Sequence, residues 1–312
     1  MDLARIVDTS ATVAATRSRK AKVAALADLI RECAADEVGL VVRYASGMLR
    51  QRRTGLGWRG LARLPRPAEA STLSVSEVDG VFERLSELSG PGSQRARAEE
   101  TERLFGRATA AEQTWLRGLV TGELRQGALD ALVQEAVAAA TALPLAAVRR
   151  AAMLSGSTPT AAEAAVSGGE DALASIGLAV GRPVSPMLAS SAPTVTDGVA
   201  KAAGSAGGQV ALDTKLDGIR IQVHRTGHEV SVATRSLDDI TDRLPEVVEY
   251  VRSLSVSSVV LDGEALALGD DGRPRPFQDT ASRTAQATGV AVTPYFFDVL
   301  HVDGDDLLDR PW

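Results

Sequence analysis

The spacing of apolar residues changes near residue 180, and this change constrains the fold more than any other feature of the sequence. Before that point apolar residues recur every three or four positions, the period of an amphipathic helix. After it Ile219, Ile221 and Val223 alternate with polar residues, the period of a strand. The sequence therefore predicts a multidomain chain: an all-α N-terminal domain followed by an α+β domain built on an antiparallel sheet.

The helical half contains four clear segments. They cover 19–33, 127–143, 143–156 and 157–169. In the last two, proline near the start and glycine at the end predict the helix limits. The segment "IGLAVGRPVSPMLASSAP" then has three prolines and no helical period. We therefore predict a helical domain over 1–178, a linker or extended lead-in over 179–200, and the second domain over 201–312.

The second half contains the turn and strand signals of a small sheet. "RTGHE" predicts the turn of a β-hairpin, and "DRLPEVVEYVRSL" predicts a short helix. "SSVVLDGEALAL" and "VTPYFFDVLHVDG" predict two further strands. The stretch "VALDTKLDGIRIQVHR", residues 210–225, also has strand character, although Lys215 and two aspartates break its apolar rhythm.

Composition narrows the classes of protein. No run of about 18 apolar residues predicts a membrane span, and the N-terminus lacks the pattern of a secretory signal. The single cysteine, Cys33, excludes an internal disulfide and a cysteine-built zinc site. We expect a cytoplasmic protein that does not enter a membrane.

Basic charge gathers in the first half. Residues 1–180 carry 22 Lys/Arg against 21 Asp/Glu, and residues 181–312 carry 12 against 19. Between Glu37 and Glu69 there is no acidic residue, whereas seven arginines occur: Arg43, Arg50, Arg52, Arg53, Arg59, Arg63 and Arg66. Such a window is either solvated surface or a contact to a phosphate backbone.

A set of polar groups interrupts the predicted strands near their ends. It comprises Lys215 with Asp217, Arg235, Glu264, and Asp298 after two phenylalanines. For each residue alone, an ion-pair network at a sheet edge is a sufficient explanation. Together they suit nucleotide chemistry: a lysine amine is a nucleophile when deprotonated, carboxylates are ligands for the Mg²⁺ that accompanies phosphates, and arginine binds phosphate oxygens.

The motifs resemble those of the covalent nucleotidyltransferases, the superfamily of ATP-dependent DNA ligases, RNA ligases and mRNA capping enzymes. "KLDG" resembles their K-x-D-G motif, "TRSLDDIT" the next motif, "LDGEALAL" the D-G-E motif, and "YFFDVLHVDG" the motif with an aromatic before Asp. All four occur in the family's order. The resemblance implies an ATP-grasp-like antiparallel sheet, with ATP and Mg²⁺ as cofactors.

The resemblance also implies residue roles. Lys215 would attack the α-phosphate of ATP and carry AMP, and Asp213 would stand where the family commonly has Glu to recognise adenine. The remaining nucleotide contacts would be Arg220 and Arg235 to phosphate or sugar, Glu264 to ribose or a metal-bound water, and Phe297 stacked on adenine. Asp217 is expected to orient the lysine loop, and no metal ligand is assigned within the chain.

The helical half resembles the DNA-binding domain of large bacterial ATP-dependent DNA ligases. "SGMLRQRRTGLGWRGL" and "LRGLVTGELRQGALDALVQEAVAAA" carry this likeness, and "GRPVSPMLA" resembles the entry to the adenylation domain. It implies a monomer that joins nicks in duplex DNA during repair, replication or recombination. The candidate DNA contacts are Arg50, Arg52, Arg53 and Arg125.

The resemblance ends before the family's Glu-Gly motif, its Lys-x-Lys motif and its OB-fold domain. We therefore expect a fragment with an incomplete adenylation domain that does not seal nicks alone. Two alternatives stay open: a non-catalytic DNA-binding remnant, and an RNA ligase or capping-type enzyme of the same superfamily.

Overall fold

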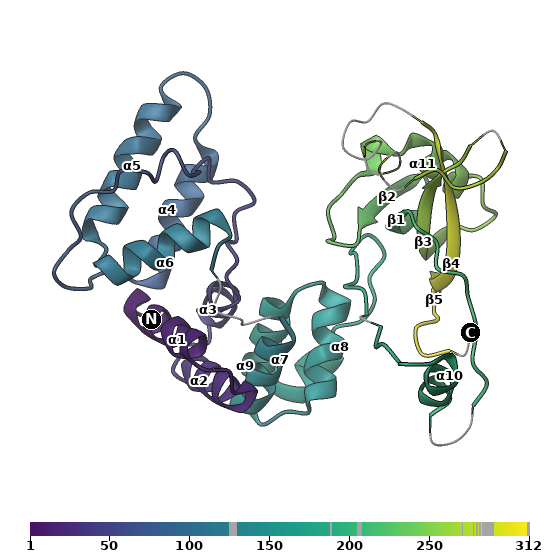
Figure 1. Ribbon diagram of the computed structural model, residues 1–312, viewed down its shortest axis with the longest axis horizontal. Helices are drawn as coiled ribbons and strands as arrows, with labels where there is room; N and C mark the ends of the chain where they lie inside the picture. The colour runs from purple at the N-terminus through teal and green to yellow at the C-terminus, as the bar shows by residue number, and fades with distance from the viewer. Residues whose placement is uncertain are drawn as a thin grey trace. The chain divides into compact units, whose positions relative to one another are not determined.

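A computed structural model describes residues 1–310 apart from 125–129, 188, 205–207, 270, 277, 279, 281 and 283–289. The chain divides into two compact units, shown in Figure 1. The first contains Met1–Ala152 and Ser157–Gly177, and the second contains Met153–Gly156 and Leu178–Trp312. The division between Gly177 and Leu178 lies beside the boundary at 178 that the change of period predicts.

The first unit is helical throughout its described regular structure. Its helices are α1 (Leu3–Ala15), α2 (Arg19–Arg31), α3 (Val38–Ala45), α4 (Val75–Glu87), α5 (Ser93–Arg107), α6 (Ala110–Thr121), α7 (Asp130–Thr141), α8 (Leu145–Ser155, whose last residues, from Met153 on, belong to the second unit) and α9 (Thr158–Ala174). The apolar stripes of these helices pack into one core, in which Tyr44, Phe82 and Phe105 are among the largest fully buried side chains. The prediction of an all-α N-terminal half is confirmed.

Local sequence signals fix several helix ends. Ser74 and Glu77 form a capping box at the start of α4, and Thr109 and Glu112 form another at α6, so each box satisfies backbone donors that the first turn leaves free. The predicted end of the fourth segment at 169 is only partly right. Gly169 adopts φ 63° and kinks α9, but the helix resumes and continues to Ala174.

The second unit is an α+β fold around a five-stranded antiparallel sheet of order β2-β1-β3-β4-β5 (Figure 1). The strands are β1 (Ile219–Thr226), β2 (Glu229–Thr234), β3 (Ser258–Ala267), β4 (Val292–Val302) and β5 (Asp305–Asp306). Helix α11 (Pro245–Arg252) buries Val247, Val248 and Val251 against the apolar face of the sheet. The predicted hairpin, helix and two further strands are all present.

The lead-in segment follows the polar face of β1. The backbone N–H of Gly181 donates to His224 Nδ1 at 3.0 Å, and that of Val184 donates to Gln222 Oε1 at 2.7 Å. His224 Nε2 lies 2.9 Å from the same Gln222 oxygen and donates to it. The lead-in is therefore fastened to the sheet at Gly181 and Val184. Helix α10 (Val195–Ala203) begins within the range 179–200 that the sequence suggests as a linker.

His224 gives this fastening a pH dependence. Burial lowers the pKa of His224 from 6.5 to about 4. Between these two pH values the imidazole is protonated in the unfolded chain but neutral in the folded chain. The free energy of unfolding therefore falls as the pH falls from 6.5 to 4. The shift corresponds to about 3 kcal/mol. In urea unfolding, wild type should lose that much stability relative to His224→Gln over this range.

The matched control for this experiment is the exposed His228. His228→Gln removes a histidine that makes none of the contacts to the lead-in, so it shows how much a histidine substitution alone changes stability between pH 7 and pH 4. A constant difference between wild type and His224→Gln would show that His224 is protonated equally in the folded and unfolded chain.

Among the described residues, no helix is long and apolar enough to cross a membrane.

Candidate active site

Lys215 stands on an exposed loop in front of β1. The strand begins at Ile219, so the prediction that 210–225 is one strand is wrong for residues 210–218, which form no strand. The Lys215 ammonium lies 3.4 Å from an Asp217 carboxylate oxygen, and 84% of the lysine side chain is exposed. An amine held this openly is accessible to a substrate.

A pocket of about 1110 Å³ opens beside this loop. Five separate stretches line it: the lead-in at Ala189, the lysine loop with the start of β1, the end of β2 with the residues after it, β3 at Glu264, and β4 at Phe297. The nucleotide-site residues expected from the sequence all contribute: Asp213, Lys215, Arg220, Arg235, Glu264 and Phe297. The fold thus brings together expected site residues up to 84 positions apart, since Asp213 and Phe297 share the pocket.

Gly218 lets the lysine loop approach β3. A Cβ at this position would lie 2.3 Å from the carbonyl oxygen of Ala265 and 2.4 Å from Leu266 Cδ2. The same approach lets the Gly218 N–H donate to Glu264 Oε1 at 3.0 Å. Burial raises the pKa of Glu264, and the Gly218 hydrogen bond opposes that rise. The glycine of "KLDG" is therefore required by the short distance between loop and strand.

Replacing Gly218 with alanine should break this contact. The colliding atom is a backbone oxygen that cannot move without shifting β3, so we expect Gly218→Ala to destabilise the second unit by roughly 1–3 kcal/mol. Urea unfolding measures the loss. Gly198→Ala in α10 is the control, because its Cβ would meet an ordinary 3.6 Å contact with Ala192. Equal stability of the two variants would contradict the close approach.

Arg220 is held between a carboxylate and an aromatic ring. Its Nε donates to Asp262 Oδ1 at 3.0 Å, and its Nη2 donates to Asp262 Oδ2. Its Cζ lies 5.4 Å from the centre of the Phe297 ring. The hydrogen bonds to Asp262 raise the pKa of Arg220, although burial opposes the rise. Two of its donors are thus engaged within the protein, and Nη1 faces no partner in these contacts.

A β-bulge sets the position of Phe297. In the β3–β4 ladder Asp262 pairs with Asp298 and Gly263 pairs with Phe296, so the register skips Phe297. Phe296 packs against the apolar core, whereas Phe297 lines the pocket. The extra residue therefore adds an aromatic ring to the polar face without moving its neighbours out of register.

Two expected residues make few contacts with the protein. Asp213 Oδ1 accepts a hydrogen bond from the Thr214 N–H at 2.7 Å, and its side chain is exposed. No hydrogen bond or ion pair ties Arg235 to the part of the chain that the structure describes. Both groups are consequently available to a ligand in the pocket.

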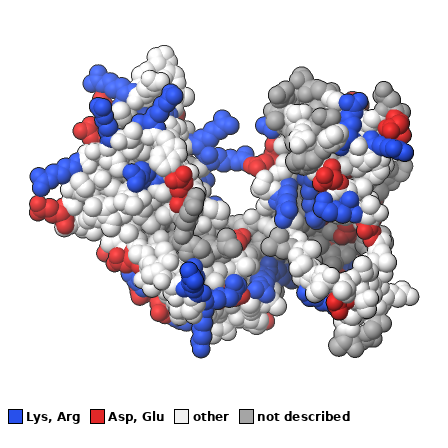
Figure 2. Space-filling view, in the orientation of Figure 1, with Lys and Arg blue, Asp and Glu red and all other residues white. Residues whose placement is uncertain are grey.

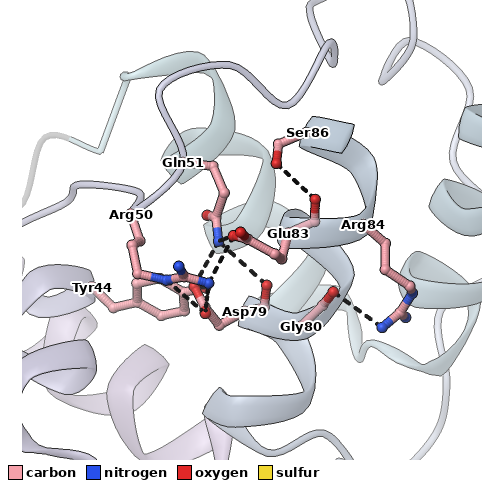
Figure 3. Close-up of polar contacts among 8 residues, drawn as sticks. All are labelled: Tyr44, Arg50, Gln51, Asp79, Gly80, Glu83, Arg84 and Ser86. Atoms are coloured by element: carbon pink, nitrogen blue, oxygen red, sulfur yellow. Dashed lines mark hydrogen bonds and ion pairs between the residues drawn. The ribbon is translucent and has the colours of Figure 1, made fainter. Parts of the chain in front are cut away.

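The candidate DNA contacts fall into three situations. Arg50 donates to Asp79 and Glu83, each at 2.8 Å from Nη2, as Figure 3 shows. Arg52 and Arg53 are exposed. Arg125 lies outside the described residues. On the face drawn in Figure 2, basic and acidic side chains are both scattered over the helical unit, so charge alone does not mark one stripe.

Sequence reasoning missed two residues that shape the site. Asp262 holds Arg220, and its signal was the aspartate of "LDGE". His224 fastens the lead-in, and only its place on the polar phase of β1 suggested a role. Within the described residues no group of three or more His, Cys, Asp or Glu side chains is placed to hold a metal ion.

Comparison with known proteins places these features in a family. Residues 186–312 match the family described as "ATP dependent DNA ligase domain", and residues 62–138 match "DNA ligase N terminus". A "Probable DNA ligase" from Nocardioides sp. is 64% identical over 98% of this chain and 60% of its own length. One from Kineococcus radiotolerans is 61% identical over 99% of this chain and 61% of its own length.

A solved structure, the ligase domain from M. tuberculosis LigD, is 31% identical over 31% of each chain, with a TM-score of 0.28. The chain spans about 60% of the length of the Nocardioides and Kineococcus relatives. The order of the two matched domains agrees with the helical unit and the sheet unit described above. The chain belongs to the ATP-dependent DNA ligase family.

Proposed function

We propose that this chain takes part in joining nicks in duplex DNA through a lysyl-AMP intermediate, with residues 1–178 binding DNA and residues 201–312 forming part of the adenylation domain. The observation that carries the proposal is the pocket shared by Lys215, Arg235, Glu264 and Phe297, which come from four separate motifs. A packing requirement alone would not gather an exposed amine, an uncommitted guanidinium and an aromatic ring around one cavity.

The proposed first step forms a phosphoamide. The Lys215 amine, having lost its proton, attacks the α-phosphorus of ATP; an N–P bond forms, the bond to the bridging oxygen breaks, and pyrophosphate leaves. Arg235 is free to contact phosphate or sugar, Asp213 to contact adenine, and Phe297 to stack on the base. Arg220 lies over the Phe297 ring and donates to Asp262 from Nε and Nη2, so its own nucleotide contact would come from Nη1.

Magnesium belongs to the proposal as a companion of the nucleotide's phosphates. The described residues present no preformed cluster of His, Cys, Asp or Glu side chains for this ion. We further propose that the protein acts as a cytoplasmic monomer in DNA repair, replication or recombination. The sequence resemblance supports this setting.

The deciding experiment has two arms. The chain is incubated with labelled ATP and magnesium and run on a denaturing gel, where a covalent adenylate supports an enzyme and its absence supports a DNA-binding protein without catalysis. Binding is then compared between nicked DNA and nicked RNA duplexes. Preference for RNA would favour the RNA-directed alternative, because the A-form groove and 2′-hydroxyls change the surface presented.

A further inference from the structure

A long connection in the helical unit exposes a tryptophan. Residues 46–74 join α3 to α4 without a helix or a strand. Connections of this length are uncommon in compact domains unless they carry a function. Residues 57–60, which we call its tip, are exposed, and Trp58 is 57% exposed. We call residues 51–61 the tryptophan loop.

The chain before the tip is pinned to α4 by a polar network (Figure 3). Gln51 is 9% exposed, and its Nε2 donates to Asp79 Oδ1 and to Glu83 Oε2, each at 3.0 Å. Arg50 Nε donates to the other Asp79 oxygen at 3.0 Å, and the Tyr44 hydroxyl lies 3.4 Å from Oδ1. Burial raises the pKa of Tyr44, so this hydroxyl stays protonated and serves as a donor.

Further contacts hold the two sides of the tip. The Thr54 carbonyl accepts from Arg97 Nε at 3.2 Å, and Gly55, at φ +69°, lies so close to Arg97 that a Cβ would come within 2.4 Å of Nε. Beyond the tip, Leu61 is 2% exposed, and its N–H donates to the Gly57 carbonyl at 3.2 Å. The loop has no regular secondary structure, but these contacts hold it on both sides of the tip. They therefore keep Trp58 at the surface.

The charge around the tip selects the kind of partner. Arg53, Arg59, Arg63 and Arg66 are exposed and have no hydrogen bond or ion pair within the described parts of the chain. No acidic residue occurs between Glu37 and Glu69 to neutralise them. A tryptophan among unpaired arginines complements a surface that alternates negative charge with apolar area. The sugar-phosphate edge of a duplex has that alternation.

We propose that the tryptophan loop inserts Trp58 against the deoxyribose edge of the minor groove of duplex DNA, with Arg53 and Arg59 on the flanking phosphates. The inference rests on the proposed function, which supplies duplex DNA as the partner. Apolar side chains in the minor groove contact sugars and base steps regardless of sequence, as nick sealing requires. Because the loop is already pinned, little ordering entropy opposes binding.

The test is the salt dependence of binding by the 312-residue chain. A labelled nicked DNA duplex is titrated with wild type, Trp58→Ala, Trp58→Phe and Met48→Ala, and fluorescence anisotropy is measured at several salt concentrations. Trp58→Ala should weaken binding about tenfold, the loss typical of one buried interface anchor, with the slope of log affinity against log salt unchanged. Trp58→Phe should recover part of the loss. Met48, 43% exposed on the same connection, is the control and should change nothing.

Each other result decides against the inference. Equal affinity of Trp58→Ala and wild type overturns it while leaving the DNA partner intact. A slope shallower by about 0.9, the loss of one phosphate contact, would mean that Trp58 only positions an arginine. A change in oligomeric state without a change in DNA affinity would assign the tryptophan to a second copy of the chain. Failure of wild type to bind duplex DNA at all would overturn the proposed function together with the inference.

Discussion

Lys215→Ala should abolish the covalent adenylate, lowering its rate of formation by roughly 10⁴-fold or more, as loss of a nucleophile does in other enzymes that form covalent intermediates. Lys215→Arg should fail equally, because a guanidinium stays protonated and has no lone pair with which to attack phosphorus. The measurement is transfer of labelled AMP to protein, followed on a denaturing gel. Lys215 is exposed and its side chain makes only 3.4 Å contacts, so neither variant should alter stability.

The control for this prediction is Lys201→Ala, since Lys201 is an exposed lysine in α10 and does not line the pocket. It should keep the full signal. Because the curated relatives are longer than this chain, the variants should also be made in a fusion to the part of the Nocardioides relative that lies beyond the match. Label in either Lys215 variant of the fusion would remove this residue from the mechanism.

Replacing Arg53, Arg59 and Arg63 together with alanine should weaken binding to duplex DNA of any sequence. Each arginine that leaves a phosphate lowers the magnitude of the slope of log affinity against log salt by about 0.9, so the triple variant should lose roughly 2.7. These guanidinium groups have no partner in the described structure, and their loss should leave the fold intact. Anisotropy titrations over a range of salt concentrations measure the effect.

The matched control is a second triple variant with the same change of net charge: Arg84, Arg95 and Arg103 replaced with alanine. These arginines are exposed but paired with acids, Arg95 with Glu99 and the other two with Glu100. Its salt slope should equal that of wild type. If both triples flatten the slope alike, binding follows net charge, and the arginine window has no special role. Neither triple variant includes Arg50, which is paired with Asp79 and Glu83. The contact of Arg50 with DNA stays a prediction.

The elements of the fold were predictable where burial imposes a period. Val247, Val248 and Val251 mark one face of α11, and Ile221 and Val223 mark one face of β1, because each set packs on the same core. The limits were less predictable. Nothing in "STPTAAEAAVSGG" distinguishes a glycine that ends a helix from Gly169, which kinks α9 while tertiary contacts such as the burial of Leu173 keep the rest helical.

The candidate site was predictable as a set of residues but not as an arrangement. The motifs named Lys215, Arg235, Glu264 and Phe297, and these residues share the pocket. The bidentate contact between Arg220 and Asp262 depends on strand register, which no local pattern encodes. The pinning of the lead-in by Gln222 and His224 links positions 38 and 43 apart in sequence, so it too was invisible.

The bulge in β4 makes the length of that strand matter as well as its composition. Deleting Phe297 would leave Phe296 opposite Gly263 and Asp298 opposite Asp262, a ladder without its irregularity at this point. The sheet would gain a regular register, and the pocket would lose its aromatic wall and the ring beneath Arg220. Deleting one residue usually harms a strand more than a substitution does. The deletion moves every side chain beyond that point to the opposite face of the sheet. Here the deletion would reverse none, so its harm would fall on the pocket alone.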